Sequence, residues 1–125
     1  MARRSVEAKS VHHANPIPTA SRVGPLLMSS IIPPRNPGAE DMPEDPEAQV
    51  ANLFHHVGEM LEVGGAGWEH IVKMTFFVPD LKLRDIINAP WVEHFPDADS
   101  RPARHTQLAA GGGKFISCDF VAYVE

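Results

Sequence analysis

Apolar residues repeat at helical spacing in the middle of the chain, over residues 50–61. Asp45 precedes this stripe as a favourable N-cap, and Pro46 suits the first helical position. A glycine-rich run at residues 64–67 follows the stripe and is typical of a helix end. The pattern predicts an amphipathic helix from Pro46 to Val63, with one face made by Val50, Leu53, Phe54, Val57 and Leu61.

Short apolar segments bounded by proline or glycine predict the strands. A second helical segment is predicted over residues 82–95, either kinked at Pro90 or restarting there with Asn88 or Ala89 as its cap. The predicted strands are residues 21–23, 26–32, 71–78, 103–108 and 115–124. This order predicts an α+β fold, in which two helices pack on one face of a single sheet.

The longer strands are apolar on both faces. In the strand at 71–78, alternation predicts that one face carries Val72, Met74, Phe76 and Val78, and the other Ile71, Lys73, Thr75 and Phe77. In the last strand, Ile116, Cys118, Phe120, Ala122 and Val124 share the helix-facing side. Two helices cover only one sheet face, so the other would be an exposed apolar patch, which favours self-association. That second face carries Phe77, Phe115, Val121 and Tyr123.

Length and charge narrow the class of protein. The 125 residues fit one domain, and we expect residues 1–14 to be a flexible N-terminal extension. The net charge of −5, with a dense basic cluster only at Arg3, Arg4 and Lys9, argues against a nucleic-acid partner. No apolar stretch is long enough to predict a membrane span. A single cysteine, Cys118, excludes an intramolecular disulfide and favours a reducing compartment, so we expect a cytoplasmic protein.

Arg104 and Asp119 are the candidate chemical groups. Arg104 opens the strand at 103–108, where its guanidinium could grip a carboxylate through two hydrogen bonds. The alternative is an ordinary surface or salt-bridge arginine. Asp119 lies among apolar residues of the last strand. It either orients water or transfers a proton, or it is a structural partner of a cation or a charge that protects an edge strand.

The other reactive residue types predict no site. The pairs His12-His13 and His55-His56 do not match zinc-ligand spacing, so we expect no metal. Cys118 falls on the apolar side of its strand and is interpreted as a small buried hydrophobe.

Several motifs occur together from about Asn15 to the end of the chain. They are Val23-Gly24, Leu27-Met28-Ser29, Gln49, Asn52, Val57, Leu61, the strand Ile71–Val78, Asn88, Phe95 and Pro102-Ala103-Arg104. In combination they are similar to the RidA/YjgF family of enamine/imine deaminases, which also carries the description endoribonuclease L-PSP.

This resemblance implies a fold, an assembly and an activity. The implied fold is chorismate-mutase-like, with a single mixed sheet and a trimeric barrel-like assembly that has clefts between subunits. The implied activity is hydrolysis of 2-aminoacrylate-like imino acids to 2-keto acids and ammonia, without a cofactor. Arg104 matches the arginine that pairs with the substrate carboxylate, and Asp119 matches a glutamate that holds the attacking water. Ser29, Asn88 and Thr106 match substrate-binding positions.

The chain also departs from the family pattern. No aromatic residue lies near Pro16-Ile17, Ser30 replaces a glycine, Thr106 replaces a cysteine, and Pro90 follows Asn88 closely. Two alternatives to a general imine deaminase are therefore kept: a dedicated catabolic enzyme resembling 2-aminomuconate deaminases, and a non-catalytic trimer that binds a small carboxylate.

Overall fold

The computed structural model of the protein describes all residues from 1 to 125. It contains one six-stranded sheet, two α-helices and three short 3-10 segments. The strands are β1 (Arg4–Val6), β2 (Ala20–Val23), β3 (Leu26–Ser29), β4 (Ile71–Val78), β5 (Ala103–Leu108) and β6 (Ser117–Tyr123). The helices are α1 (Pro46–Gly64) and α2 (Asn88–His94), and the 3-10 segments are η1 (Trp68–His70), η2 (Leu81–Ile87) and η3 (Ala110–Gly112).

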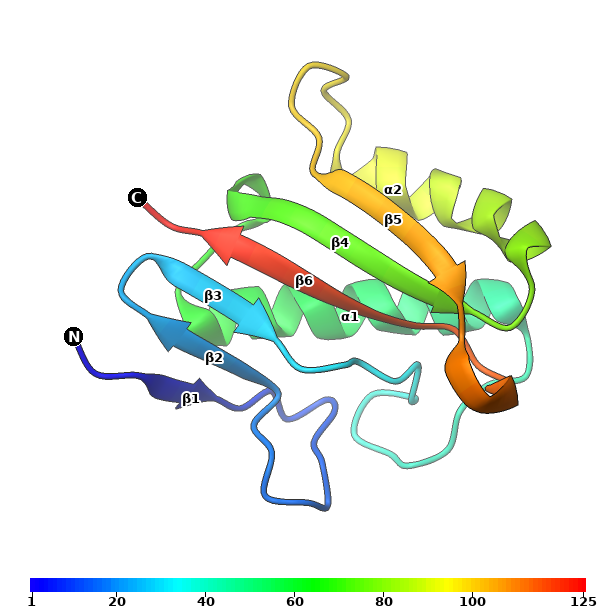
Figure 1. Cartoon of the computed structure of the whole chain (residues 1–125), viewed down its shortest axis with the longest axis horizontal. Coiled ribbons are helices and arrows are strands. Elements are labelled where there is room, and N and C mark those ends of the chain that lie inside the picture. The colour runs from blue at the N-terminus through cyan, green and yellow to red at the C-terminus, as the bar shows by residue number, and fades with distance from the viewer.

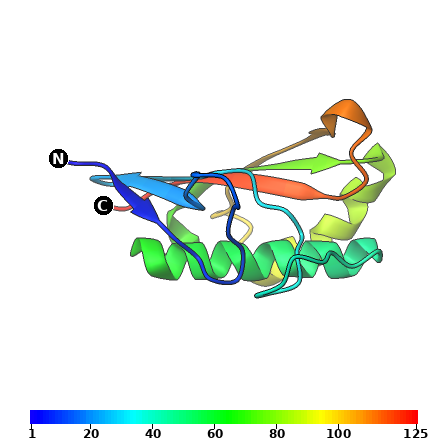
Figure 2. The same cartoon turned by 90° about the horizontal axis from the view of Figure 1, so that it is seen from below.

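The strands lie in the order β1-β2-β3-β6-β4-β5, and only the β4–β5 pair is parallel. Figure 1 shows this order, with β5 at one edge of the sheet and β1 at the other. Seen edge-on in Figure 2, both helices lie on the same side of the sheet. The prediction of a single mixed sheet with two helices on one face is confirmed.

Helix α1 begins and ends where local sequence signals favour it. The Asp45 side chain accepts a hydrogen bond from the Ala48 backbone N–H at 3.1 Å, which caps the first turn. Gly65 has a φ of 77°, in the left-handed region where glycine is favoured, and it ends the helix. The Arg22 guanidinium donates to the Gly64 carbonyl at 2.6 Å, so a strand residue also holds the helix end.

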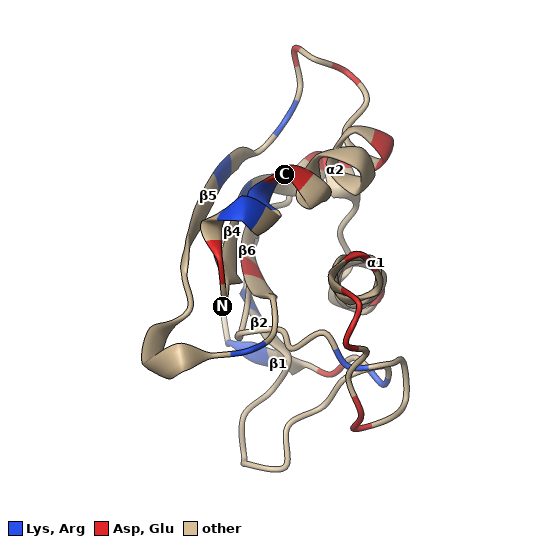
Figure 3. Ribbon diagram, turned by 90° about the vertical axis from the view of Figure 1, so that its right-hand side faces the viewer, with Lys and Arg blue, Asp and Glu red and all other residues tan.

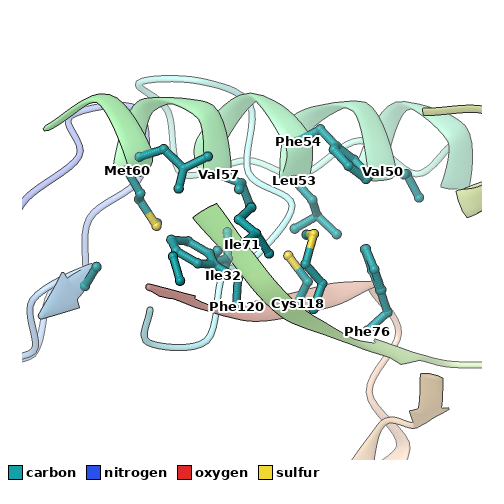
Figure 4. Close-up of a cluster of buried hydrophobic side chains, with 14 of the residues drawn as sticks. Ile32, Val50, Leu53, Phe54, Val57, Met60, Ile71, Phe76, Cys118 and Phe120 are labelled. Atoms are coloured by element: carbon teal, nitrogen blue, oxygen red, sulfur yellow. The ribbon is translucent and has the colours of Figure 1, made fainter. Parts of the chain in front are cut away.

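The core lies between α1 and the sheet. Its buried hydrophobic residues form one continuous cluster of 23 residues. In Figure 4, side chains such as Leu53 and Val57 of α1 point toward Phe120 and Cys118 of β6. Burial of this apolar surface is the main force that holds the helix on the sheet.

Strand β4 departs from the predicted alternation at its first residues. Ile71 is 6% exposed and Val72 is 54% exposed, so the predicted faces of these two residues are wrong. The register with β6 shifts between Ile71 and Lys73, which is a β-bulge. An extra residue in one strand reverses the facing of the residues before it, whereas the predicted faces from Lys73 to Val78 are confirmed.

The predicted flexible extension over residues 1–14 is wrong for residues 4–11. Strand β1 pairs with β2, and Val6, Ala8 and Val11 are at most 2% exposed. The Thr19 hydroxyl accepts from the Ala8 N–H at 2.9 Å and donates to the Val6 carbonyl at 2.7 Å. A paired edge strand with buried apolar residues is part of the core, which short-range patterns did not reveal.

The remaining differences concern element ends and the second helix. Strand β3 ends at Ser29, three residues early, and Ile32 makes only an isolated bridge to Cys118. The segment at 82–95 is a 3-10 helix followed by α2, which starts at Asn88 with Ile87 in the cap position. Pro90 lies in the first turn of α2, the part of a helix in which proline is best tolerated.

Candidate active site

Arg104 lies on the edge strand β5, on the face that the helices cover. It is opposite Met74 of β4, which is fully buried against the helices. Its guanidinium carbon lies 5.2 Å from the centroid of the Trp91 ring, within cation–π range. Its Nη2 donates to the backbone carbonyl of Arg84 at 3.3 Å. The side chain is therefore held at the junction of β5, η2 and α2.

The guanidinium has hydrogen-bonding capacity that the chain itself does not use. The contact to the Arg84 carbonyl is its only intramolecular hydrogen bond, and no carboxylate lies within 4.0 Å of it. No buried side-chain nitrogen lacks a partner, so the unused N–H groups of Arg104 are open to solvent. Arginine offers five N–H donors in a fixed fork, so a carboxylate can still bind here.

Both the neighbouring charges and the partial burial of Arg104 shift the pKa of its guanidinium. Partial burial lowers the pKa of the guanidinium, the positive charge of Arg84 lowers it further, and Asp85 opposes this shift. An arginine keeps its charge at neutral pH despite such a shift. The site thus has a permanent positive charge with a second positive charge close to it.

Asp119 lies on the opposite face of the sheet from Arg104. It pairs with Thr75, whereas Arg104 pairs with Met74, and successive strand residues point to opposite faces. Burial raises the pKa of the Asp119 carboxyl, and the charge of Lys73 partly counteracts this. Because β4 lies between β5 and β6, one chain does not bring Arg104 and Asp119 to the same ligand.

The three predicted substrate-binding residues are dispersed. Thr106 lies opposite Phe76 on the same face as Arg104 and is half-buried. Asn88 is exposed at the start of α2, four residues after Arg84. Ser29 lies at the end of β3, where its hydroxyl accepts from the Phe120 N–H at 2.9 Å. The structure groups Arg104 with Thr106 and places Ser29 nearer to β6.

Sequence reasoning missed Trp91 and Arg84 as neighbours of Arg104. Trp91 follows the buried Ile87 at helical spacing, and this signal marks a core-facing tryptophan but not its contact with an arginine. Nothing in the sequence around Arg84 indicates that its carbonyl and its charge meet a residue 20 positions later.

The face of the sheet away from the helices carries the predicted large apolar side chains, with polar residues such as Lys73 and Asp119 among them. Phe77, Phe115 and Val121 are half-buried there, and Tyr123 is 50% exposed. Further large hydrophobic side chains are exposed on β3 and at the start of β4, namely Leu26, Met28 and Val72. Such a patch is typical of a protein–protein contact surface.

Three hollows occur on the surface of the chain, with volumes of about 340–370 Å³. The first lies beside the loop at 96–102, the second beside Phe77 and Phe115, and the third between α1 and α2. Neither Arg104 nor Asp119 lines any of them. The single chain therefore does not enclose these two residues in a cleft.

The histidines and the cysteine have structural surroundings. The Nδ1 of His56 is 2.8 Å from the Ser10 hydroxyl, and its Nε2 is 2.7 Å from the Arg35 carbonyl, so both ring nitrogens are engaged. No group of three or more potential metal ligands is close enough to hold an ion. Cys118 is fully buried, and burial raises the pKa of its thiol.

Neither α1 nor any other helix combines the length and the hydropathy needed to cross a membrane.

Comparisons with known proteins define the class of this chain. A sequence model described as Endoribonuclease L-PSP matches residues 8–111. A RutC family protein of Aquifex aeolicus is 34% identical over 71 residues, which is 57% of this chain and 57% of that protein. A RutC family protein of Synechocystis is also 34% identical, over 58 residues, which is 46% of this chain and 44% of that protein. The chain thus aligns with about half the length of these curated relatives.

Solved structures extend the similarity to the complete chain. The Rid-family protein YyfA of Yersinia pestis has a TM-score of 0.87 and 24% identity, covering 98% of this chain and 100% of its own. The YjgF gene product of E. coli has a TM-score of 0.84 and 24% identity, covering 98% and 99%. At this identity the likeness is one of fold. With the sequence match, it shows that the chain belongs to the Endoribonuclease L-PSP family, also called the RidA/YjgF family.

The distribution of charged residues, shown in Figure 3, is relevant to the ribonuclease description of the family. Lys and Arg positions are scattered over several elements in this view, and acidic positions lie among them. The net charge is −5. Proteins that bind nucleic acid through its phosphates typically gather their cations on one face.

Proposed function

We propose that this protein hydrolyses small 2-imino acids, or their enamine forms, to 2-keto acids and ammonia, and that Arg104 binds the substrate carboxylate. The observation that carries this proposal is the Arg104 guanidinium, which is half-buried against Trp91, has open N–H groups and has no carboxylate partner within the chain. A permanently charged fork without its own counter-ion is suited to a carboxylate ligand.

The chemistry needs positioning more than a strong nucleophile. The carbon of a C=N bond is electrophilic, so water adds to it directly, and the resulting aminoalcohol loses ammonia to leave a keto group. Arg104 would fix the acid end so that the imine carbon meets the water in a productive geometry. Asp119 would orient that water and exchange protons with the nitrogen, and burial, which raises the pKa of its carboxyl, favours this proton exchange. No cofactor takes part in these steps.

The proposed site is completed by a second copy of the chain. Arg104 and Asp119 lie on opposite faces of one sheet, so both can act on one substrate only if they come from different protomers. The apolar face with Phe77, Phe115 and Tyr123 provides a surface for such contact. A closed trimer, in which each copy uses the same two surfaces, would satisfy this requirement at every site.

The test is the Arg104→Ala variant, with imino acids generated in situ by an amino-acid oxidase and the keto acid measured as it forms. We expect the variant to lose imine turnover while its oligomeric state by light scattering is unchanged. Lys82→Ala is the matched control, because Lys82 is an exposed cation on the neighbouring η2 segment. Unchanged turnover in Arg104→Ala would remove Arg104 from the mechanism, and a monomer in solution would exclude the composite site.

The same experiment separates catalysis from binding. If the wild-type protein binds a 2-keto acid through Arg104 but never accelerates imine hydrolysis, it is a carboxylate-binding regulatory protein instead. Retention of RNA at moderate salt is the corresponding test of the ribonuclease description, and we expect none because the cations are dispersed.

A further inference from the structure

Arg84 is the basic residue next to the proposed carboxylate anchor. The Arg104 Nη2 donates to the Arg84 backbone carbonyl at 3.3 Å, so the guanidinium of one arginine touches the backbone of the other. The Arg84 side chain is exposed on η2, and it makes no side-chain hydrogen bond or ion pair within the chain. Its three-carbon stem therefore remains free to turn toward a ligand held at Arg104.

The two like charges are not neutralised by the chain. The charge of Arg84 acts on Arg104 directly, and it is second only to burial among the effects that lower the pKa of Arg104. The one acidic group that acts on Arg104 is Asp85, whose effect is smaller and which lies beyond ion-pair distance. Asp85 faces the hollow between α1 and α2, together with Glu47 and Glu93.

This arrangement is unexpected in an acidic protein. The chain has 16 acidic and 11 basic side chains, yet no acidic side chain forms an ion pair with Arg84 or Arg104. The positive charge of Arg84 opposes that of Arg104, whose guanidinium lies against the Arg84 backbone, and a ligand that brings two negative charges relieves this repulsion. A ligand with one carboxylate at Arg104 leaves the second charge without a partner.

We propose that the Arg104 site takes a dicarboxylate, in which Arg104 binds the carboxylate next to the imine carbon and Arg84 binds the carboxylate at the far end. The substrate class is therefore imino acids derived from dicarboxylic acids, and the product class is 2-oxo dicarboxylates. This inference rests on the proposed function for the reaction, and it adds the chemical class of the substrate.

The test compares two product-like ligands that differ only at the far end. 2-Oxoglutarate and 2-oxopentanoate have the same five-carbon chain, ending in a carboxylate and in a methyl group. We expect the wild-type protein to bind 2-oxoglutarate about tenfold more tightly by titration calorimetry at low salt, which is the scale of one additional charge-assisted contact. This preference should decline as salt is added.

Three variants, each of which removes one charge, test which residue causes the preference for 2-oxoglutarate. Arg84→Gln should reduce the affinity ratio of the two ligands to about one. Lys82→Gln removes the same charge from the same segment without acting on Arg104, so it should keep the ratio. Asp85→Asn removes the opposing charge and should increase the ratio. Equal affinities in the wild type, or a preference that survives Arg84→Gln, would overturn the proposal.

Turnover measurements separate this inference from the proposed function. The imines of the same two acids are offered to the wild-type enzyme. Equal hydrolysis of both supports the deaminase and overturns the dicarboxylate preference. Hydrolysis of neither, with Arg84-dependent binding of 2-oxoglutarate, overturns the deaminase and supports the dicarboxylate site. Selective hydrolysis of the dicarboxylic imine, lost in Arg84→Gln, supports both.

Discussion

The contact between Trp91 and Arg104 allows a direct measurement of how firmly the proposed anchor is held. The indole packs edge-on against Phe95 with ring centroids 4.7 Å apart, and it is only 7% exposed. Its position is therefore fixed by the core. We predict that replacing Trp91 with leucine and Arg104 with methionine, singly and together, reveals a favourable coupling between the two side chains.

The expected size of this coupling depends on how deeply the two side chains are buried. Cation–π pairs contribute about 0.5–1 kcal/mol at exposed sites and about 2 kcal/mol when desolvated. The Arg104 side chain is half-buried and its guanidinium carbon is 5.2 Å from the ring centroid, so we expect a coupling of about 1 kcal/mol. The single change Trp91→Leu should cost more, about 2–3 kcal/mol, because it also removes packing in the core.

The assay is urea unfolding of the four proteins, followed by circular dichroism so that the loss of a tryptophan does not alter the signal. Protomer concentration is held constant, since self-association would contribute to stability. The double-mutant cycle removes the packing cost of Trp91→Leu, which appears with either residue at position 104. A coupling below about 0.3 kcal/mol would refute the idea that the indole holds the guanidinium.

Two further predictions concern buried polar groups. Gln49→Ala should lower the free energy of unfolding by about 3 kcal/mol, because it leaves the buried Ile116 N–H, which the Gln49 side chain accepts at 2.9 Å, without an acceptor. Urea unfolding measures this change. As a control, Gln107→Ala at an exposed position should change the free energy of unfolding by less than about 0.5 kcal/mol. His56 has its pKa lowered by burial, so the unfolded chain binds a proton more readily, and the free energy of unfolding should decrease as the pH falls below the ordinary histidine value of 6.5. Unfolding at pH 7.5 and 5.5 tests this, and a decrease that is undiminished in His56→Gln would contradict the assignment.

Two features that the local sequence pattern did not predict show the limit of such patterns. The β-bulge at the start of β4 reverses the facing of Ile71 and Val72, although the residues themselves alternate as in a regular strand. Strand β1 has only three residues, and its place in the core depends on pairing with β2, 14 or more positions later in the chain. Neither feature changes the local hydrophobic period, which is the quantity that a sequence pattern reports.

The sequence by itself determined most of the longer elements, and it indicated Arg104 as the main candidate residue. Helix α1 was predictable because its cap, its apolar stripe and its terminal glycine act within a few residues of one another. The facing of Lys73 to Val78 and of the last strand follows from backbone geometry, which sends successive side chains to opposite faces. Arg104 could be named because an arginine near the start of a strand suits a carboxylate, and because Pro102-Ala103-Arg104 is similar to the family motif.

Only the tertiary structure decided what surrounds Arg104. The ring of Trp91, the carbonyl of Arg84 and the separation from Asp119 all result from parallel pairing of β4 with β5 and from the return of η2 beside that edge. These contacts join segments that are distant in sequence. They are selected by the packing of the whole core, because register and crossing geometry depend on all the elements that share it.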